Sequence, residues 1–166
     1  MKKINTLLCT LLLPVLLFAQ AQDEFIFENG DDNVVFVETI ELDRTQAFVP
    51  AGLYFGWMLS RDLQSDMIME YADYTLEDFN SKESTGPELF MTDWEGVLSG
   101  ELMKEDVYRF SKTYFSSGDY EKDLQTTFQL GTSSIYTIED TWENFAKIQA
   151  VIDQKYEGWQ SQRRTR

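Results

Sequence analysis

The chain is most informative in the residue types that it lacks. It has no histidine, one cysteine and three prolines among 166 residues. Histidine is the usual general base near neutral pH, and histidine and cysteine are the usual ligands of zinc and related metals. With a single cysteine, Cys9, the chain also cannot form an internal disulfide. These absences exclude cysteine–histidine and serine–histidine catalysis, and we expect neither a metal site nor a cofactor.

The first 21 residues have the composition of a secretory signal peptide. Lys2 and Lys3 give a basic start, an apolar run follows over 7–18, and small residues stand at positions 19 and 21, where signal peptidase would cut. An apolar run of about twelve residues is too short to cross a bilayer, which takes roughly twenty. We therefore expect cleavage after Ala21, one domain over 22–166 without a membrane span, and a periplasmic or secreted location reached by bacterial export.

Negative charge dominates the expected mature domain. Removing Lys2 and Lys3 from 14 basic residues leaves 12 against 29 acidic ones, a formal charge of −17. Such a charge repels nucleic acid and disfavours anionic membrane surfaces, so we expect neither as a partner. It attracts basic proteins, which makes a basic protein the partner that the composition favours. Solubility alone would also account for the charge.

The spacing of apolar residues predicts a mainly α-helical fold, a compact single-domain bundle of several helices. Residues 47–59 are almost all apolar or small, and they predict a buried central helix. Within it, Gly52 and Gly56 leave a smooth strip that another element can approach closely. Shorter helices are expected over 64–71 and 103–114. Three further helices are expected to begin at Thr75, which is expected to cap its helix, at Pro87 and at Asp119.

The clearest predicted helix lies at the end of the chain. Its apolar residues recur at three- and four-residue spacing over about five turns and predict one stripe that faces the core: Trp142, Phe145, Ile148, Ile152, Tyr156 and Trp159. Trp142 is expected to be the first buried ring of this stripe. Near the other end of the domain, the β-branched run Val34–Ile40 predicts a minor N-terminal β element.

Several segments carry a resemblance to a known family. The run 140–145 reads D-T-W-E-N-F, and related segments stand upstream at 55–59 (F-G-W-M-L), 85–89 (T-G-P-E-L), 94–98 (W-E-G-V-L) and 110–115 (F-S-K-T-Y-F). Together they resemble an uncharacterised bacterial domain family whose members commonly read D-T-W-E-N-Y at the final helix. The resemblance spans roughly 49–159 and implies a helical framework with no assigned reaction. Phe145 departs from the family's tyrosine, so a role of that hydroxyl is not carried over.

Four residues are candidates for binding a partner, and none is a candidate for catalysis. Asp140 and Glu143 bring acidic groups to the start of the last helix, where Asp140 is expected to cap the helix and Glu143 to complete a capping box. Asn144 has no evident structural task there. Tyr120, with acidic neighbours on both sides, would be an apolar anchor among charges if exposed, or a core residue if buried.

A separate acidic run, Glu28–Asn33, has a composition like that of calcium-binding loops. It lacks the spacing of an EF-hand, which requires oxygen ligands at alternate positions and a glutamate at the twelfth. We interpret this run as a solvated turn, and it adds no metal site.

Two classes of function remain. Carboxylates with ordinary pKa values near 4 are ionised at neutral pH, where they act as fixed charge rather than as proton donors. The composition therefore favours a non-catalytic protein-binding module, either an immunity-type protein that neutralises a basic toxin or an accessory envelope protein. The alternative is a carboxylate-dependent hydrolase acting in the cell envelope, because paired carboxylates can hydrolyse glycosides.

Overall fold

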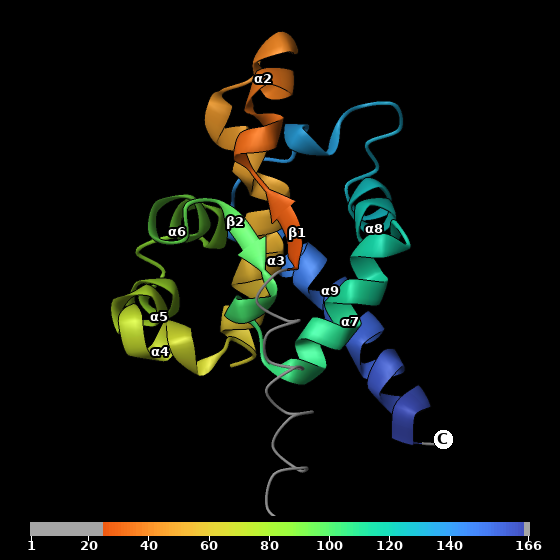
Figure 1. Ribbon diagram of the computed structural model, residues 1–166. Helices are drawn as coiled ribbons and strands as arrows, with labels where there is room; N and C mark the ends of the chain where they lie inside the picture. The colour runs from red at the N-terminus through yellow and green to blue at the C-terminus, as the bar shows by residue number, and fades with distance from the viewer. Residues whose placement is uncertain (1–24, 165–166) are drawn as a thin grey trace, which may run out of the picture.

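The structure, a computed structural model, describes residues 25–164. The predicted signal peptide lies outside the described residues, so export and location stay predictions. The described elements follow one another along the chain as shown in Figure 1: β1 (Ile26–Asn29), α2 (Asp31–Thr39), the 3₁₀ turn η1 (Arg44–Phe48), α3 (Val49–Ser60), α4 (Asp66–Tyr71), α5 (Asp73–Ser81), α6 (Gly86–Asp93), β2 (Val97–Ser99), η2 (Gly100–Leu102), α7 (Glu105–Ser116), α8 (Asp119–Thr127), η3 (Ile135–Thr137) and α9 (Trp142–Arg164). The prediction of a mainly helical single domain is confirmed.

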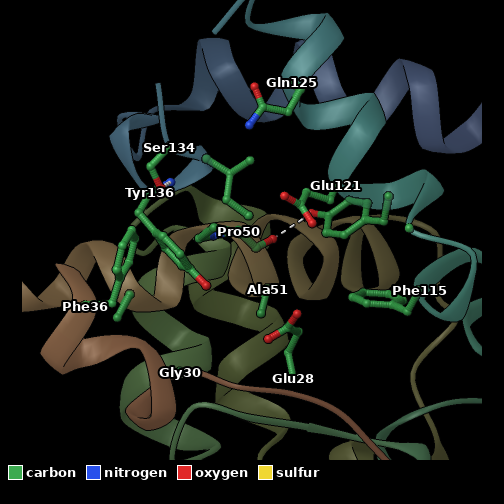
Figure 2. Close-up of a pocket in the computed structure, with 14 residues that line it drawn as sticks. Glu28, Gly30, Phe36, Pro50, Ala51, Phe115, Glu121, Gln125, Ser134 and Tyr136 are labelled. Atoms are coloured by element: carbon green, nitrogen blue, oxygen red, sulfur yellow. Dashed lines mark hydrogen bonds between the residues drawn. The ribbon is translucent and has the colours of Figure 1, made fainter. Parts of the chain in front are cut away.

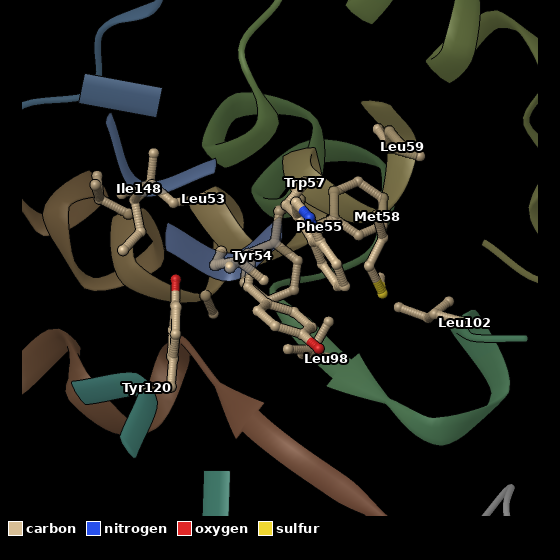
Figure 3. Close-up of a cluster of buried hydrophobic side chains, with 14 of the residues drawn as sticks. Leu53, Tyr54, Phe55, Trp57, Met58, Leu59, Leu98, Leu102, Tyr120 and Ile148 are labelled. Carbon is tan, nitrogen blue, oxygen red and sulfur yellow. The ribbon is translucent and has the colours of Figure 1, made fainter. Parts of the chain in front are cut away.

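Helix α3 lies at the centre of this fold, with α4, α5 and α6 on one side and α7, α8 and α9 on the other (Figure 1). Every residue of α3 except Ser60 is buried, and Pro50 occupies its first turn, where its missing N–H costs no hydrogen bond. Side chains of α3 meet Leu98 from β2, Leu102 from η2 and Ile148 from α9 in one cluster (Figure 3). The predicted central helix is therefore confirmed.

The glycine strip of α3 receives the start of α6. A methyl group on Gly52 would lie 2.3 Å from the Pro87 Cα atom, and one on Gly86 would lie 2.8 Å from the Gly56 Cα atom. These distances show that the backbones of α3 and α6 are in direct contact at glycines, which have no side chain to separate them. The prediction of a close approach at Gly52 and Gly56 is confirmed.

The β element is not the one that the sequence predicts. Val34–Ile40 was expected to be a strand, but Val34 to Thr39 lie in α2, and the strands are β1 and β2, an antiparallel pair that matches Glu28 with Leu98. Two local features favour the helix: Asn29 Oδ1 accepts a hydrogen bond from the Asp31 N–H, and Asp31 begins an acidic first turn that the helix dipole stabilises. The helix preference of β-branched residues is only slightly lower than average, so these features outweigh it.

Two predicted helix caps are also wrong. Thr75 lies inside α5, where its buried hydroxyl donates to Asp93 at 2.7 Å. At α9, Thr141 rather than Asp140 caps the helix, because the Thr141 hydroxyl accepts a hydrogen bond from the Asn144 N–H at 3.1 Å. Asp140 instead accepts one from the Thr85 hydroxyl at 2.5 Å. The side chains of Asp140 and Thr141 could each cap α9. The hydrogen bond from Thr85 engages Asp140, and Thr141 is the cap.

Among the residues that the structure describes, no helix combines the length and the apolar composition needed to cross a membrane.

Candidate functional site

The three candidate residues at the start of α9 all have structural partners. The Asn144 side-chain amide donates to the Glu139 carbonyl oxygen at 2.9 Å, and Glu143 pairs with Lys147 one turn further along the helix at 2.8 Å. The second carboxylate oxygen of Asp140 is buried and has no hydrogen-bond partner among the residues that the structure describes. Burial raises the pKa of Asp140 against the opposing effect of its hydrogen bond from Thr85. This end of α9 is therefore held by two local contacts and by the hydrogen bond from Thr85.

Tyr120, the fourth candidate, is a core residue and not an exposed anchor. Its side chain is 4% exposed, and its hydroxyl donates to the Pro50 carbonyl oxygen at 2.6 Å (Figure 2). The ring packs against Tyr54 and Phe115 at centroid distances of 5.3 and 4.9 Å. Tyr120 also lines a pocket that Asp140, Glu143 and Asn144 do not reach, so the structure does not bring the four candidates together.

That pocket, called here the Glu28 pocket, is a hollow of about 320 Å³ at one end of the fold. Figure 2 shows its fourteen lining residues, which come from β1, α2, η1, α3, α7, α8 and η3 and the segments between them. Phe36 and Tyr136 form an aromatic wall, Pro50 and Ala51 belong to the start of α3, and Glu28 and Glu121 carry the two carboxylates. None of the lining residues that the structure describes is basic. The pocket is therefore both aromatic and acidic.

Glu28 is a half-buried carboxylate without a counter-charge. Within the described part of the chain it forms neither a hydrogen bond nor an ion pair through its side chain. Burial raises the pKa of Glu28, and the negative charges of Glu121 and Asp32 raise it further. Burying a charge without a partner is costly. Glu28 therefore makes the pocket favourable for a positively charged group.

Tyr136 is held in place on the opposite side of the pocket. The Ser134 hydroxyl accepts a hydrogen bond from the Tyr136 N–H, and the ring meets Phe36 edge-on at 5.9 Å between centroids. Burial raises the pKa of Tyr136 to about 12, with contributions from Glu28 and Glu121. The hydroxyl therefore keeps its proton at neutral pH, and the two aromatic rings offer the kind of surface that attracts cations.

The loop above the pocket is tied to α8 by Gln125. The Gln125 side-chain amide donates to the Ser133 carbonyl oxygen at 3.3 Å, while its own carbonyl oxygen is buried and has no hydrogen-bond partner in residues 25–164. Gln125 thereby links α8 to the segment that positions Tyr136. Glu121 lies one turn earlier on α8. The hydrogen bond of Gln125 therefore connects the helix that carries the Glu121 carboxylate to the segment that carries the Tyr136 hydroxyl.

An exposed apolar surface, formed by α2 and the residue that follows it, adjoins the pocket. Val35, Phe36 and Ile40 are 71%, 48% and 38% exposed. Phe36 belongs both to this surface and to the pocket wall. Contiguous exposed apolar residues beside a polar hollow are characteristic of surfaces that bind other proteins.

Sequence reasoning missed this pocket because its residues are far apart in the chain. The run that contains Glu28 was interpreted as a solvated turn, whereas Glu28 lies in β1 and pairs with Leu98. Only that pairing, together with the packing of α8 and η3, brings Glu28 near Glu121 and Tyr136. A local signal existed only for Tyr120, whose acidic neighbours drew attention to the correct part of α8.

No group of three or more acidic side chains in residues 25–164 is placed to hold a metal ion.

We expect Glu28→Gln to stabilise the fold at neutral pH. The raised pKa means that the folded chain binds the Glu28 proton more tightly than the unfolded chain does. This contribution to stability is fully present below the unfolded pKa and is lost as the pH rises through the folded pKa. Glutamine keeps the uncharged form, so urea unfolding at pH 7 should show a higher midpoint for the variant, and the difference should shrink towards about pH 4.

Glu77→Gln is the matched control for this prediction, because it removes one charge from an exposed position on α5. Its unfolding midpoint should change little. A Glu28→Gln variant that is less stable than the natural chain at pH 7 would mean that the carboxylate makes a favourable contact in the fold.

Comparison with known protein families matches the chain to a family whose activity is unknown. Residues 27–138 match the family described as Domain of unknown function (DUF7832). The match contains every residue of the Glu28 pocket and ends before the D-T-W-E-N-F run at 140–145. That run and the bacterial origin therefore stay predictions. Neither a curated protein nor a solved structure matches the chain. Because the match covers more than half of its residues, the chain belongs to the DUF7832 family.

Proposed function

We propose that this protein is a non-catalytic binding module that recognises a basic protein through the Glu28 pocket and the exposed apolar surface of α2. The observation that carries this proposal is the half-buried Glu28 carboxylate, which has no counter-charge among the described residues and opens into an aromatic hollow. A partner that supplies a positive charge would relieve the cost of burying this group. The proposal places the binding site within the residues that define the family.

Charge and apolar contact would have separate tasks in this interaction. The formal charge of −15 on the whole chain would speed the encounter with a basic protein, an effect that falls as salt rises. Charge alone gives little lasting affinity, because exposed ion pairs contribute little. Val35 and Phe36 on α2 would supply apolar contact around the charged centre, an arrangement that concentrates binding energy in a few residues.

The proposal extends to two finer forms, both of which assume export to the cell envelope. In the first, the protein is an immunity-type protein that neutralises a basic toxin. In the second, it is an accessory envelope protein with a basic structural partner. A toxin-like open reading frame beside its gene would favour the first form.

One observation also supports the alternative, a carboxylate-dependent hydrolase. Glu28 and Glu121 lie in the same pocket, and the raised pKa of Glu28 is a property of carboxyl groups that act as general acids. Hydrolysis of an envelope glycan would additionally require a groove for a chain of sugars. A hollow of about 320 Å³ fits a single side chain better than such a polymer. The pocket therefore favours binding.

We expect the pocket, rather than total charge, to select the partner. The mature chain can be used as bait in envelope extracts at low and at physiological salt, beside two variants with equal charge. The first is Glu28→Gln/Glu121→Gln, and the second is Glu70→Gln/Glu77→Gln, which changes exposed positions on α4 and α5. One basic protein should be recovered by the natural chain and by the second variant, but not by the first.

The recovered protein is then identified, purified and titrated against all three chains. Loss of affinity confined to the pocket variant supports the proposal. If the captured proteins are merely the most basic ones present, or if both variants capture them equally, the binding-module proposal is wrong. Release of sugars from envelope glycans by the natural chain but not by Glu28→Gln would favour the hydrolase instead.

A further inference from the structure

Three oxygen-bearing side chains surround the Glu28 pocket without bonding to one another. They are Glu28 on β1, Glu121 on α8 and Tyr136 on η3. The charges of both carboxylates act on the Tyr136 hydroxyl and raise its pKa. The charge of Glu121 in turn raises the pKa of Glu28. No hydrogen bond joins any two of the three in the described structure, so their mutual effect is that of charge across the hollow.

Among the described residues, the pocket lining provides no group that could neutralise these charges. The lining within residues 25–164 contains two carboxylates and no basic residue, and the Gln125 amide is already bonded to the Ser133 carbonyl oxygen. A cation must therefore come from outside the pocket. It would meet two carboxylates and one neutral hydroxyl, whose oxygen can accept a hydrogen bond.

The arrangement of the acceptors favours a compact cation over a planar one. The two carboxylates and the hydroxyl come from three different elements, and Figure 2 shows Glu28 and Glu121 approaching from different directions, with Tyr136 across the hollow. An ammonium group has three donors that point in different directions. A guanidinium group is a flat fork that binds best to one carboxylate in its own plane. Acceptors spread around a hollow suit the ammonium group.

The remaining wall suits the apolar stem of such a group. Phe36 and Tyr136 present aromatic rings, and Ile135 adds an aliphatic side chain beside them. The methylene groups of a lysine side chain pack readily on apolar surface while the charged end stays with its acceptors. Phe36 is 48% exposed, so the stem would enter over the α2 surface.

From this geometry we infer that the Glu28 pocket binds a primary alkylammonium group, presented as a lysine side chain of the basic partner. Glu28 and Glu121 accept the charged end together with the Tyr136 hydroxyl, and Phe36 covers the stem. This inference rests on the proposed function, since it names the partner residue that enters the pocket. It also predicts selection, because lysine should be preferred to arginine and acetylation of the lysine should abolish binding.

The experiment uses the ¹⁵N-labelled chain and three small probes, observed by ¹H–¹⁵N NMR. The probes are Nα-acetyl-lysine methylamide, its Nε-acetylated form and Nα-acetyl-arginine methylamide. We expect the lysine probe to shift the amide signals of Glu121, Gln125 and Tyr136, with a dissociation constant on the order of 1 mM, as for one isolated side chain. The acetylated probe should give no saturable shift, and the arginine probe should bind more weakly.

Two variants test the assignment of the site. Glu28→Gln/Glu121→Gln should weaken the lysine probe by about tenfold or more, because charge-assisted hydrogen bonds are lost. Glu70→Gln/Glu77→Gln should leave its affinity unchanged. Circular dichroism checks that both variants are folded, which is expected because Glu28→Gln removes an unfavourable charge. Equal binding of the lysine probe by both variants, or of the acetylated and unacetylated probes by the natural chain, would overturn the inference.

The two proposals can fail separately. If the pocket variant loses the basic partner but the natural chain prefers the arginine probe, the binding module stands and the lysine assignment is wrong. If the lysine probe binds as expected but no partner depends on the pocket, the ammonium site stands and the protein-binding function is wrong.

Discussion

Trp57→Ala is expected to lower the free energy of unfolding by ~3–5 kcal/mol. Trp57 is fully buried in α3, and its ring packs on Tyr54 and Tyr156 with centroid distances of 5.0 and 5.4 Å. Its indole N–H donates to Asp153 on α9 at 2.9 Å, so the side chain joins the central helix to the last one. Urea unfolding followed by circular dichroism would measure the loss, a large share of the ~5–15 kcal/mol of a small domain.

Trp57→Phe separates the ring from the hydrogen bond. Phenylalanine keeps most of the buried area, and the Asp153 oxygen that loses the indole partner still accepts a hydrogen bond from the Arg61 side chain at 2.8 Å. The expected cost is therefore smaller, about 1 kcal/mol for the bond plus a modest packing loss. If Trp57→Phe destabilises the chain as much as Trp57→Ala, the hydrogen bond to Asp153 rather than ring burial would account for the effect.

Trp142 gives a second comparison and corrects an expectation. The stripe on the last helix predicts Trp142 as a buried core ring, but it is only half-buried, packed on Phe79 and Phe145 with Lys82 over its face. Trp142 is the first residue of α9, one turn before the buried Phe145, and one side of its ring meets solvent. Trp142→Ala should consequently cost less than Trp57→Ala. An equal cost would show that the contacts at the start of α9 are as important as the buried centre.

The helical framework could be predicted because its signals are local. The spacing of Phe145, Ile148 and Ile152 places them on one side of α9, and all three are buried. The run 47–59 predicts α3 because continuous apolar residues with a proline in the first turn suit a fully buried helix. In both helices, local preference and long-range packing favour the same structure.

The sequence was a poor guide where two local choices have similar energies. Val34–Ile40 suits a strand by side-chain type, but the acidic turn at Asp31 and the hydrogen bond from its N–H to Asn29 favour a helix. Thr141 and Asp140 are both good helix caps. The hydroxyl of Thr85, far away in the chain, donates a hydrogen bond to Asp140, and Asp140 does not cap the helix. Such choices depend on packing that a local pattern does not contain.

The candidate site was predictable only in part, for the same reason. Tyr120 was selected for its acidic neighbours, one of which, Glu121, does line the pocket. Glu28 and Tyr136 gave no such signal, because each becomes significant only through the other segments around the hollow. A site assembled from β1, α2, α8 and η3 has no short motif that identifies it.

Gly52→Ala is expected to destabilise the fold by about 1–3 kcal/mol or more, although alanine is the better helix former. The added methyl group would lie 2.3 Å from the Cα atom and 2.8 Å from the nitrogen of Pro87. Both atoms belong to the backbone of α6, so no side-chain rotation can relieve the overlap, and α6 must move away from α3. Urea unfolding should show a lower midpoint, and the loss should exceed the gain in helix propensity.

Two other glycines form a graded series with Gly52. At Gly56 the nearest atoms to an added methyl group are 3.2 and 3.3 Å away, and two of them belong to the side chains of Phe145 and Phe79, so Gly56→Ala should cost less. At Gly158 in α9 nothing lies within 4 Å, and Gly158→Ala should stabilise the chain by about 0.5–1 kcal/mol through helix propensity alone. If all three variants become more stable, propensity rather than close helix packing determines the effect, and α3 and α6 do not touch as tightly as these distances require.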